Sequence, residues 1–347
     1  MKTYKLALLG FGHVGQAFAR LLMRKADQLA DEYRIQPVVT AIATGSRGRA
    51  IDPNGIDLWA ALNLIESGQM LDNLSAEPAP EDNIAFIQAS GADVLFENTP
   101  VSYLDGQPAI DHIRAALEMG MHAVTANKGP VVYGYHTLTA LAAQKGVRFL
   151  FESTVMDGAP VFGMTRETIP AANIHRIEGV LNSTTNLILT HMENGESFDE
   201  AVRYAQSIGI AETDPSGDVD GWDSAIKISA LITVLMKTPF TPDKVNRDGI
   251  KEITPEKIAA AKAEGKRWKL ICTAEKRADG IEAKVAPAMV GPDTPAYTID
   301  GTTSIVTLES DVLGTLSLIE ADPSPITTAY GLLADLINAV KGRSAKG

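Results

Sequence analysis

Two groups of residues have types and spacings that could do chemistry. The run Gly10-Phe11-Gly12-His13-Val14-Gly15 follows an apolar stretch and opens a helical pattern. Glycines at these positions let the backbone approach a pyrophosphate at a helix amino terminus, so the run predicts a dinucleotide-binding turn. Asp223 and Lys227 stand four residues apart, on one face of a predicted helix. Taken alone, such a pair is more typical of an exposed ion pair than of a catalytic site.

The choice of cofactor should depend on the end of the second predicted strand. An NAD enzyme usually holds the ribose 2′-hydroxyl there with a carboxylate, but residues 43–49 contain no acid. Arg47 or Arg49 could instead hold a 2′-phosphate through charge-assisted hydrogen bonds. NADP is therefore the expected cofactor, NAD is the alternative, and the other interpretation is that both arginines are simply solvated.

The glycine motif needs a sheet to position it, and the first third of the chain provides the pattern for one. Short apolar runs alternate there with longer helical patterns, at residues 4–9, 37–43, 93–96, 122–125 and 147–151, with the first helix continuing to about Leu29. This alternation predicts an α/β domain, a doubly wound parallel Rossmann sheet over residues 1–150. Glu97-Asn98-Thr99-Pro100 and Lys128 follow two of these strands, at the edge where such sheets bind ligands.

The regular alternation of short strands and longer helices ends near residue 150. The pattern that follows predicts an α+β domain over residues 151–322. A strand leads into a helix between Ile174 and Leu189, and Ser197 with Glu200 forms a capping box before the next helix. Further helices are expected at residues 223–236 and 326–340, and further strands at 268–275, 281–287 and 304–308. The last segment, residues 323–347, is expected to pack back on the first domain.

The composition of the chain restricts the classes of partner that it can bind. The net charge of -12 is spread along the chain without a basic cluster, which argues against a nucleic-acid surface and favours a small-molecule substrate. There is no signal-peptide pattern and no apolar stretch long enough for a membrane span. The single cysteine, Cys272, cannot form an internal disulfide, which fits a reducing, cytoplasmic compartment. We expect Cys272 to be a small residue of the core.

Three further motifs resemble those of homoserine dehydrogenases. They are the acidic-lysine run from Ala211 to Lys227, the loop Gly179–Asn186 and the lysine loop Thr125–Pro130. The resemblance covers essentially the full chain, in the short form without a fused kinase or a regulatory domain. It implies an NAD(P)-dependent oxidoreductase that interconverts homoserine and aspartate 4-semialdehyde, and a homodimer formed through the second domain.

The resemblance also implies roles for individual residues. Lys227 would exchange the proton, Asp223 would position it and bind substrate, Glu212 would hold the substrate's amino group, and Lys128 would lie between nicotinamide and substrate. Further substrate contacts are expected from Asp218, Ser183 and Thr184, and further cofactor contacts from Thr99, Lys128 and Gly209. A monovalent cation is expected at Glu152, Val155, Asp157 and Ala159.

Two departures from the family pattern leave alternatives open. Ser183 replaces a glycine in the substrate loop, and the segment Ile319–Pro325 has no glycine where the family has a glycine-rich loop. If that segment still closes over the nicotinamide, Glu320 and Asp322 bring negative charge to it. The alternatives are a relative that acts on another small amino or hydroxy acid, and a catalytically silent dinucleotide sensor.

Overall fold

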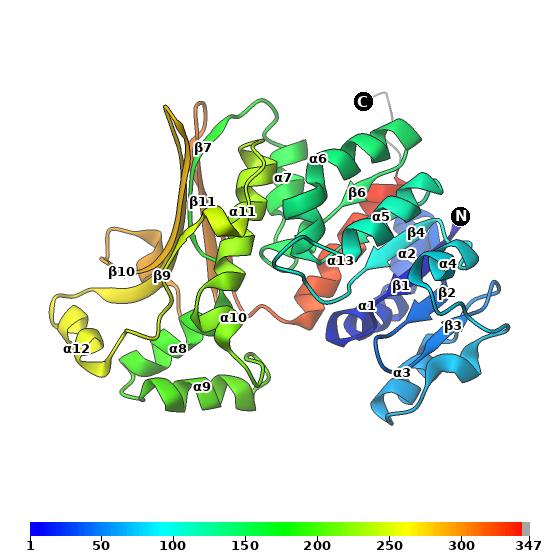
Figure 1. Ribbon diagram of the computed structural model, residues 1–347, viewed down its shortest axis with the longest axis horizontal. Coiled ribbons are helices and arrows are strands. Elements are labelled where there is room, and N and C mark those ends of the chain that lie inside the picture. The colour runs from blue at the N-terminus through cyan, green and yellow to red at the C-terminus, as the bar shows by residue number, and fades with distance from the viewer. Residues whose placement is uncertain (342–347) are drawn as a thin grey trace. The chain divides into compact units, whose positions relative to one another are not determined.

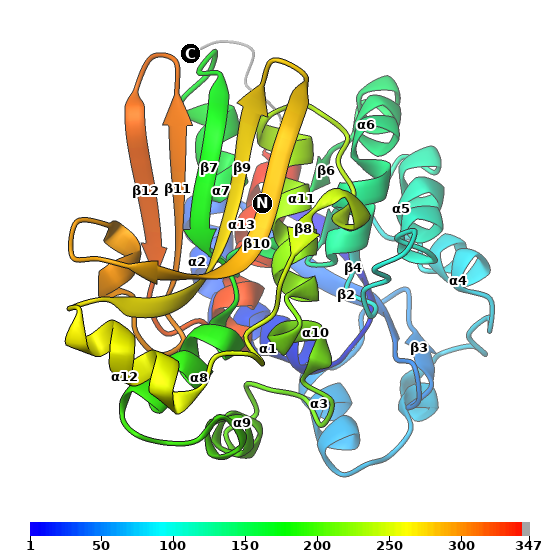
Figure 2. The same ribbon diagram turned by 60° about the vertical axis from the view of Figure 1, so that its left-hand side comes forward.

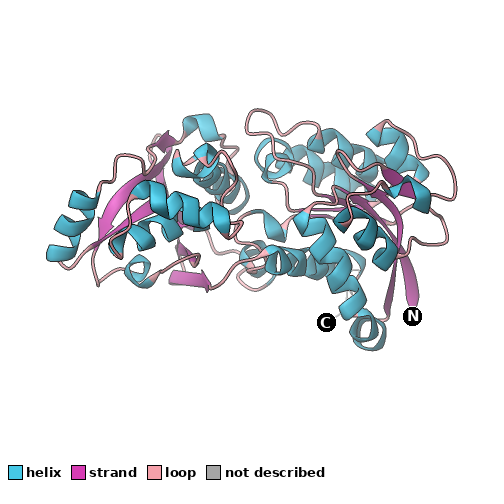
Figure 3. Ribbon diagram, turned by 90° about the horizontal axis from the view of Figure 1, so that it is seen from below, coloured by secondary structure: helices cyan, strands magenta, loops and turns pink. Residues whose placement is uncertain are grey.

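The computed structural model describes residues 1–341, which form two compact units. The first unit comprises Met1–Pro160 together with the segment from Ser324 onward, and the second unit comprises Val161–Pro323. The last helix thus belongs to the first unit, as the sequence predicts. Helices and strands are present in both units (Figure 3).

The chain leaves the first unit about ten residues later than residue 150, because the residues after the last strand bond to the last helix. Ser153 Oγ donates a hydrogen bond to the Thr328 carbonyl at 2.7 Å. Asp157 Oδ2 accepts one from Thr327 Oγ1 at 3.0 Å. These bonds hold the segment to the first unit.

A six-stranded sheet forms the centre of the first unit, in the order β3-β2-β1-β4-β5-β6. Its strands are β1 (Lys2–Leu9), β2 (Ile35–Ala43), β3 (Arg49–Ile51), β4 (Val94–Glu97), β5 (His122–Thr125) and β6 (Phe149–Leu150). All neighbouring pairs are parallel except β2 and β3. The predicted parallel sheet is confirmed, and β3, which is too short to show a strand pattern in the sequence, adds one antiparallel pair at its edge.

Helices cover both faces of this sheet, as expected for a doubly wound fold. They are α1 (His13–Arg24), α2 (Ala26–Tyr33), α3 (Leu58–Glu66), α4 (Asn83–Ala89), α5 (Ala109–Glu118), α6 (Lys128–Lys145) and α13 (Pro325–Val340), with short turns η1 (Leu71–Leu74) and η2 (Glu152–Thr154). Figure 1 shows α13 beside α1. Phe18 of α1 packs on Phe96 of β4 with ring centroids 4.4 Å apart, in the same core as Leu332.

The single helix predicted as far as Leu29 is in fact two helices. Lys25 ends α1 and precedes α2, with φ −103 and ψ 9, outside the helical range. No glycine or proline marks this break in the sequence, and we have no physical account of it.

The second unit contains a sheet in the order β12-β11-β7-β9-β10-β8. Its strands are β7 (Ile174–Val180), β8 (Asn246–Arg247), β9 (Arg267–Arg277), β10 (Gly280–Val290), β11 (Ser304–Ser310) and β12 (Gly314–Glu320). Its helices are α7 (Val161–Glu167), α8 (Ser183–Glu193), α9 (Phe198–Ser207), α10 (Ser216–Val219), α11 (Trp222–Leu235) and α12 (Pro255–Ala263), with turns η3 (Pro242–Lys244) and η4 (Pro295–Thr298). Helices α8, α11 and α12 contact β9, and Figure 2 shows the long strands side by side.

Several local predictions are confirmed here, and others are wrong. The capping box of Ser197 and Glu200 is present at α9. The segment Ile319–Pro325 is not a loop throughout, because Ile319 and Glu320 belong to β12 and pair with β11. The edge strand β12 was not predicted, although Thr315-Leu316-Ser317-Leu318 alternates polar and apolar residues as a strand does. Cys272 is fully buried, as predicted, and burial raises the pKa of its thiol to about 12.

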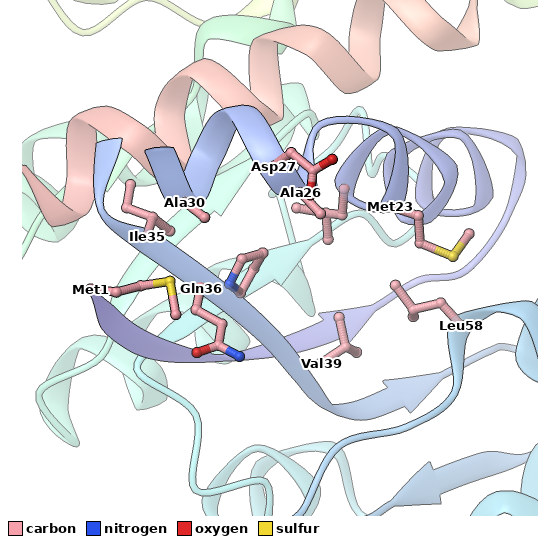
Figure 4. A pocket seen from close by; sticks show the side chains of 11 residues that line it. Met1, Met23, Ala26, Asp27, Ala30, Ile35, Gln36, Val39 and Leu58 are labelled. Carbon is pink, nitrogen blue, oxygen red and sulfur yellow. The ribbon is translucent and has the colours of Figure 1, made fainter. Parts of the chain in front are cut away.

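One pocket lies at the amino-terminal ends of β1 and β2 (Figure 4). Ile35, Gln36 and Pro37 of β2 and Met23 and Ala30 of the helices line it. Parallel sheets bind nucleotides at the opposite, carboxyl ends of their strands. This pocket is therefore not the predicted nucleotide site.

Among residues 1–341, no helix is both long and apolar enough to cross a lipid bilayer.

Candidate active site

The glycine motif of the first unit lies between β1 and α1, the context that the prediction requires. Gly10 has φ +98, and a Cβ there would stand 2.3 Å from the Asn98 carbonyl oxygen. A Cβ at Gly15 would stand 2.6 Å from the carbonyl oxygen of Gly10. Neither position can hold a side chain unless the backbone moves, so both glycines are needed for the turn itself.

Gly12 has a different role from its two neighbours in the motif. A Cβ at Gly12 would meet nothing within 4 Å, and no side chain caps α1 at this residue. The amino terminus of α1 can therefore accept an anion such as a pyrophosphate. His13 and Val14 start the helix, whereas the Phe11 side chain is buried in the core and could offer only its backbone to a ligand.

The end of β2 has an acidic neighbour that the sequence-based prediction did not include. The chain segment there contains no acid, but η1 brings the Asp72 carboxylate against Gly48, with Oδ2 only 1.9 Å from where a Cβ would stand. Arg47 donates to the Gly68 carbonyl and is exposed. Arg49 donates to the Pro80 carbonyl at 3.0 Å and lies over the Phe86 ring. Of the two arginines, Arg47 is thus the better placed to meet a ligand.

The loops after β4 and β5 carry the next predicted residues. Asn98 Oδ1 accepts from the Ala126 amide at 3.2 Å, while its buried Nδ2 has no hydrogen-bond partner among the described residues. A buried donor without a partner fits a site that a ligand completes. Thr99 follows in the same loop, and Lys128 is the first residue of α6, which Asn127 caps. The residues present therefore fit a dinucleotide.

In the second unit, Asp223 and Lys227 meet on α11 as predicted. The Lys227 Nζ lies 3.0 Å from Asp223 Oδ2, and the side chains are only 16% and 12% exposed. The ammonium also donates to the Leu181 carbonyl at 2.8 Å. The pair is therefore not an ordinary exposed ion pair, because burial and a third partner hold Lys227 in one position.

Asn182, which was not among the predicted site residues, joins this pair to a second carboxylate. Its Nδ2 donates to Asp218 Oδ1 at 2.6 Å and to Asp223 Oδ2 at 3.0 Å. Its Oδ1 accepts from the Thr185 amide and so caps α8. The signal that could have found it is an asparagine directly before the helix-opening Ser183, which is typical of an N-cap.

Asp218 is a partly buried carboxylate that interacts with Asp223. Burial and the negative charge of Asp223 raise its pKa, while hydrogen bonds from Asn182 and Thr184 oppose the rise. Two carboxylates held this close favour a cationic ligand, since a positive charge would relieve their repulsion. The acidic segment is therefore not merely solvated.

The other predicted substrate residues lie around this group. Thr184 Oγ1 donates to the Ile210 carbonyl at 3.3 Å, and Ser183 Oγ lies 3.4 Å from Ser304 Oγ. Glu212 is exposed, and its backbone carbonyl accepts from Gln206 Nε2 at 3.1 Å. Gly209, predicted to contact the cofactor, ends the turn after α9 with φ +75.

The four residues predicted to bind a cation follow β6 in the first unit. Glu152 is buried and Asp157 has φ +40, with its carboxylate bonded to Thr327. Residues 1–341 contain no group of three or more His, Cys, Asp or Glu able to hold a metal ion. A cation at Glu152, Val155, Asp157 and Ala159 would therefore depend on backbone carbonyl oxygens as well as on carboxylates.

Two family models match the chain, and together they cover most of its length. Residues 10–152 match the NAD binding domain of homoserine dehydrogenase, and residues 160–337 match the homoserine dehydrogenase domain itself. The chain belongs to the homoserine dehydrogenase family. The expected family and enzyme class, an NAD(P)-dependent oxidoreductase, are thereby confirmed.

Three members of this family match the chain over nearly their whole length. The chain is 35% identical to an NAD(+)-dependent homoserine dehydrogenase of Pseudomonas canavaninivorans, covering 100% of this chain and 99% of that protein. It is 36% identical to a homoserine dehydrogenase of Methanocaldococcus jannaschii, covering 96% and 97%. A hyperthermophilic archaeal homoserine dehydrogenase solved with NADPH has a TM-score of 0.81 at 29% identity, covering 97% and 98%. These comparisons lend no support to the two alternative functions.

Proposed function

We propose that this protein interconverts homoserine and aspartate 4-semialdehyde by hydride transfer with an NAD(P) cofactor. The observation that carries the proposal is the set of Asp218, Asp223 and Lys227, joined by the buried Asn182, in a chain of this family. Oxidising an alcohol removes a hydride from carbon and a proton from oxygen. The cofactor supplies the hydride chemistry when it is bound, and the protein must exchange the proton.

Lys227 is the proposed proton-exchanging residue. Asp223 and the Leu181 carbonyl hold its ammonium group from two sides and so fix where the proton can be passed. The carboxylates of Asp218, Asp223 and Glu212 suit the substrate's ammonium group. Ser183 and Thr184 open α8, whose amino terminus suits the substrate's carboxylate. Lys128 is proposed as the second lysine, between nicotinamide and substrate.

For the cofactor, we propose that NADP is bound through Arg47 and that NAD is accepted as well. The guanidinium offers five N–H donors, and the Gly68 carbonyl needs only one of them. Asp72 opposes the 2′-phosphate because its carboxylate lies beside the same turn. The preference for NADP is therefore expected to be modest. The glycines Gly10, Gly12 and Gly15, with Thr99 and Gly209, complete the proposed cofactor contacts.

Three wider proposals rest on the family resemblance together with local features. We propose a monovalent cation at Glu152, Val155, Asp157 and Ala159, because oxygen ligands suit a hard cation. We propose a homodimer formed through the second unit. We also propose a cytoplasmic location, since one buried, unpaired cysteine suits a reducing compartment.

The test of the proposed activity is a spectrophotometric assay of the purified protein. NADP⁺ or NAD⁺ should be reduced when homoserine is added, and aspartate 4-semialdehyde should oxidise NADPH or NADH. Threonine and 2-hydroxybutyrate serve as controls for a general hydroxy-acid dehydrogenase. Turnover of either control in the absence of turnover of homoserine would contradict the proposal.

A further inference from the structure

Glu97 is a fully buried carboxylate at the carboxyl end of β4, and the roles proposed above do not use it. Its exposed fraction is 0%. Oε1 accepts hydrogen bonds from the Thr99 amide at 3.3 Å and from the Thr99 hydroxyl, and lies 3.4 Å from Nδ1 of His112. Since these contacts converge on an oxygen acceptor, they fit an ionised carboxylate rather than a protonated one.

His112 leaves the negative charge of Glu97 uncancelled. Its Nε2 lies 2.9 Å from Asn83 Nδ2, an amide nitrogen that can only donate. With the Asn83 amide in this orientation, Nε2 accepts, and Nδ1 carries the ring hydrogen and donates it to Glu97. Within residues 1–341, the ion pairs of Glu97 include no lysine or arginine. A net negative charge is thus buried beneath the edge of the sheet.

Hydrogen bonds connect this charge to both loops at the nucleotide-binding edge. Thr125 Oγ1 donates to the Glu97 carbonyl at 2.6 Å and lies 3.5 Å from Oε2. Asn127 donates through its backbone amide to Thr125 Oγ1 at 2.9 Å and through Nδ2 to the Thr99 carbonyl at 3.0 Å. Asn127 also caps α6, which begins at Lys128. Glu97 therefore lies under the loops that carry Thr99 and Lys128.

The order of the strands indicates which half of the cofactor these loops face. The topological switch lies between β1 and β4, and the glycine turn after β1 receives the pyrophosphate. The half of the dinucleotide that extends over β4 and β5 is then the nicotinamide half. Its ring carries a positive charge in the oxidised cofactor and none in the reduced cofactor.

We propose that Glu97 is a positioning residue whose buried negative charge favours the oxidised cofactor over the reduced one. The inference rests on the proposed function only in requiring that NAD(P) binds to the first unit. A charge in a poorly solvated interior acts over a longer distance than a charge in water. Glu97 would therefore stabilise the cationic nicotinamide without touching it, and would also hold Thr99 in place.

The test compares the dissociation constants of the oxidised and reduced cofactors in the full-length protein without substrate. For Glu97→Gln, which keeps the shape and removes the charge, the ratio Kd(oxidised)/Kd(reduced) should rise between about threefold and tenfold. Calorimetric or fluorescence titrations with NADP⁺ and NADPH, and with NAD⁺ and NADH, would measure it. A purely structural role would weaken both forms equally and leave the ratio unchanged, and that result would overturn the inference.

Two sets of control variants distinguish an effect of the Glu97 charge from an effect on packing. Thr40→Val removes a buried hydrogen bond of 2.9 Å to the Ser90 carbonyl in the same unit, so it should lower Tm without changing the ratio. His112→Asn can still donate to Glu97 and should keep the ratio, whereas His112→Lys places a positive charge beside the carboxylate and should raise it. If Glu97→Gln does not fold, the two His112 variants decide the matter, and equal ratios for them would overturn the inference.

These outcomes are distinct from those of the activity assay. If the unaltered protein binds NADP⁺ and NADPH but does not oxidise homoserine, the proposed function fails while the ratio remains measurable. If it oxidises homoserine and Glu97→Gln leaves the ratio unchanged, only the role of Glu97 fails.

Discussion

The residues proposed to bind ligands are arranged differently in the two units. In the first unit, the nucleotide turn is made mainly of backbone, and Gly12 leaves open space at the amino terminus of α1. In the second unit, Asp218, Asp223, Lys227 and Asn182 bond to one another through their side chains. The glycine turn offers open space and backbone groups to a ligand, whereas the second unit offers an arranged set of charged side chains. Changes in the first unit should therefore alter cofactor affinity, and changes in the second should alter turnover.

The largest expected effect is at Lys227. Proton transfer by a positioned side chain contributes about 10²–10⁴-fold to rate, so Lys227→Ala should lower kcat by that order while cofactor Kd stays near normal. Steady-state kinetics with cofactor titrations would measure both. The matched control is Lys251→Ala, which removes a more exposed ion pair of 2.6 Å to Asp220 in the same unit and should keep kcat. Near-full turnover by Lys227→Ala would show that the proton is exchanged elsewhere, with Lys128 the next candidate.

Gly12→Ala should produce the next largest effect, and it should act on binding alone. The added methyl meets no protein atom within 4 Å, so Tm should not change. The methyl group would stand where the pyrophosphate approaches, and losing charge-assisted contacts there should raise the cofactor Kd about 10–100-fold. Gly15→Ala is the comparison variant, since it clashes with the Gly10 carbonyl and should lower Tm as well. A lower Tm for Gly12→Ala would contradict the division of roles within the motif.

Arg47 and Asp72 should act in opposite directions on the choice of cofactor. Arg47→Ala should weaken NADP binding about tenfold and leave NAD nearly unchanged, because only NADP has the 2′-phosphate. Asp72→Asn should tighten NADP binding by a smaller factor, and this gain should shrink at high salt. Parallel titrations with both cofactors would measure these changes. Equal losses of NAD and NADP in Arg47→Ala would show that the arginine does not contact the phosphate.

The smallest effect concerns stability and follows from the pKa of Asp218. Because burial and Asp223 raise that pKa, the folded state binds the proton more tightly than the unfolded state does. Asp218 therefore lowers stability at pH values above its folded pKa, and this cost vanishes below its ordinary value of 3.8. Asp218→Asn should raise Tm by a few degrees at neutral pH and not in acid, while KM for homoserine increases. Thermal unfolding measured across pH would detect this change. An unchanged Tm at pH 7 would indicate that the two carboxylates do not lower the stability of the folded state.

Much of the local structure could be predicted from sequence because it depends on short-range geometry. The glycine motif predicts the strand–turn–helix at Gly10–Gly15, and Ser197 with Glu200 predicts the start of α9. The spacing of Asp223 and Lys227 predicts their contact, since residues four apart on a helix are neighbours. The family resemblance supplied the roles of these residues, which geometry alone did not.

Contacts between residues far apart in the chain depend on tertiary packing and could not be predicted from the sequence pattern. Asn182 meets Asp218 and Asp223 because the start of α8 packs beside α10 and α11, and Asp72 reaches Gly48 because η1 folds against the end of β2. Glu97 looks like a polar residue at a strand end, yet α5 covers it with His112. Local propensity is a property of neighbouring residues, whereas burial, pairing and the sharing of a charge depend on how whole elements pack, so the sequence pattern alone did not reveal these contacts.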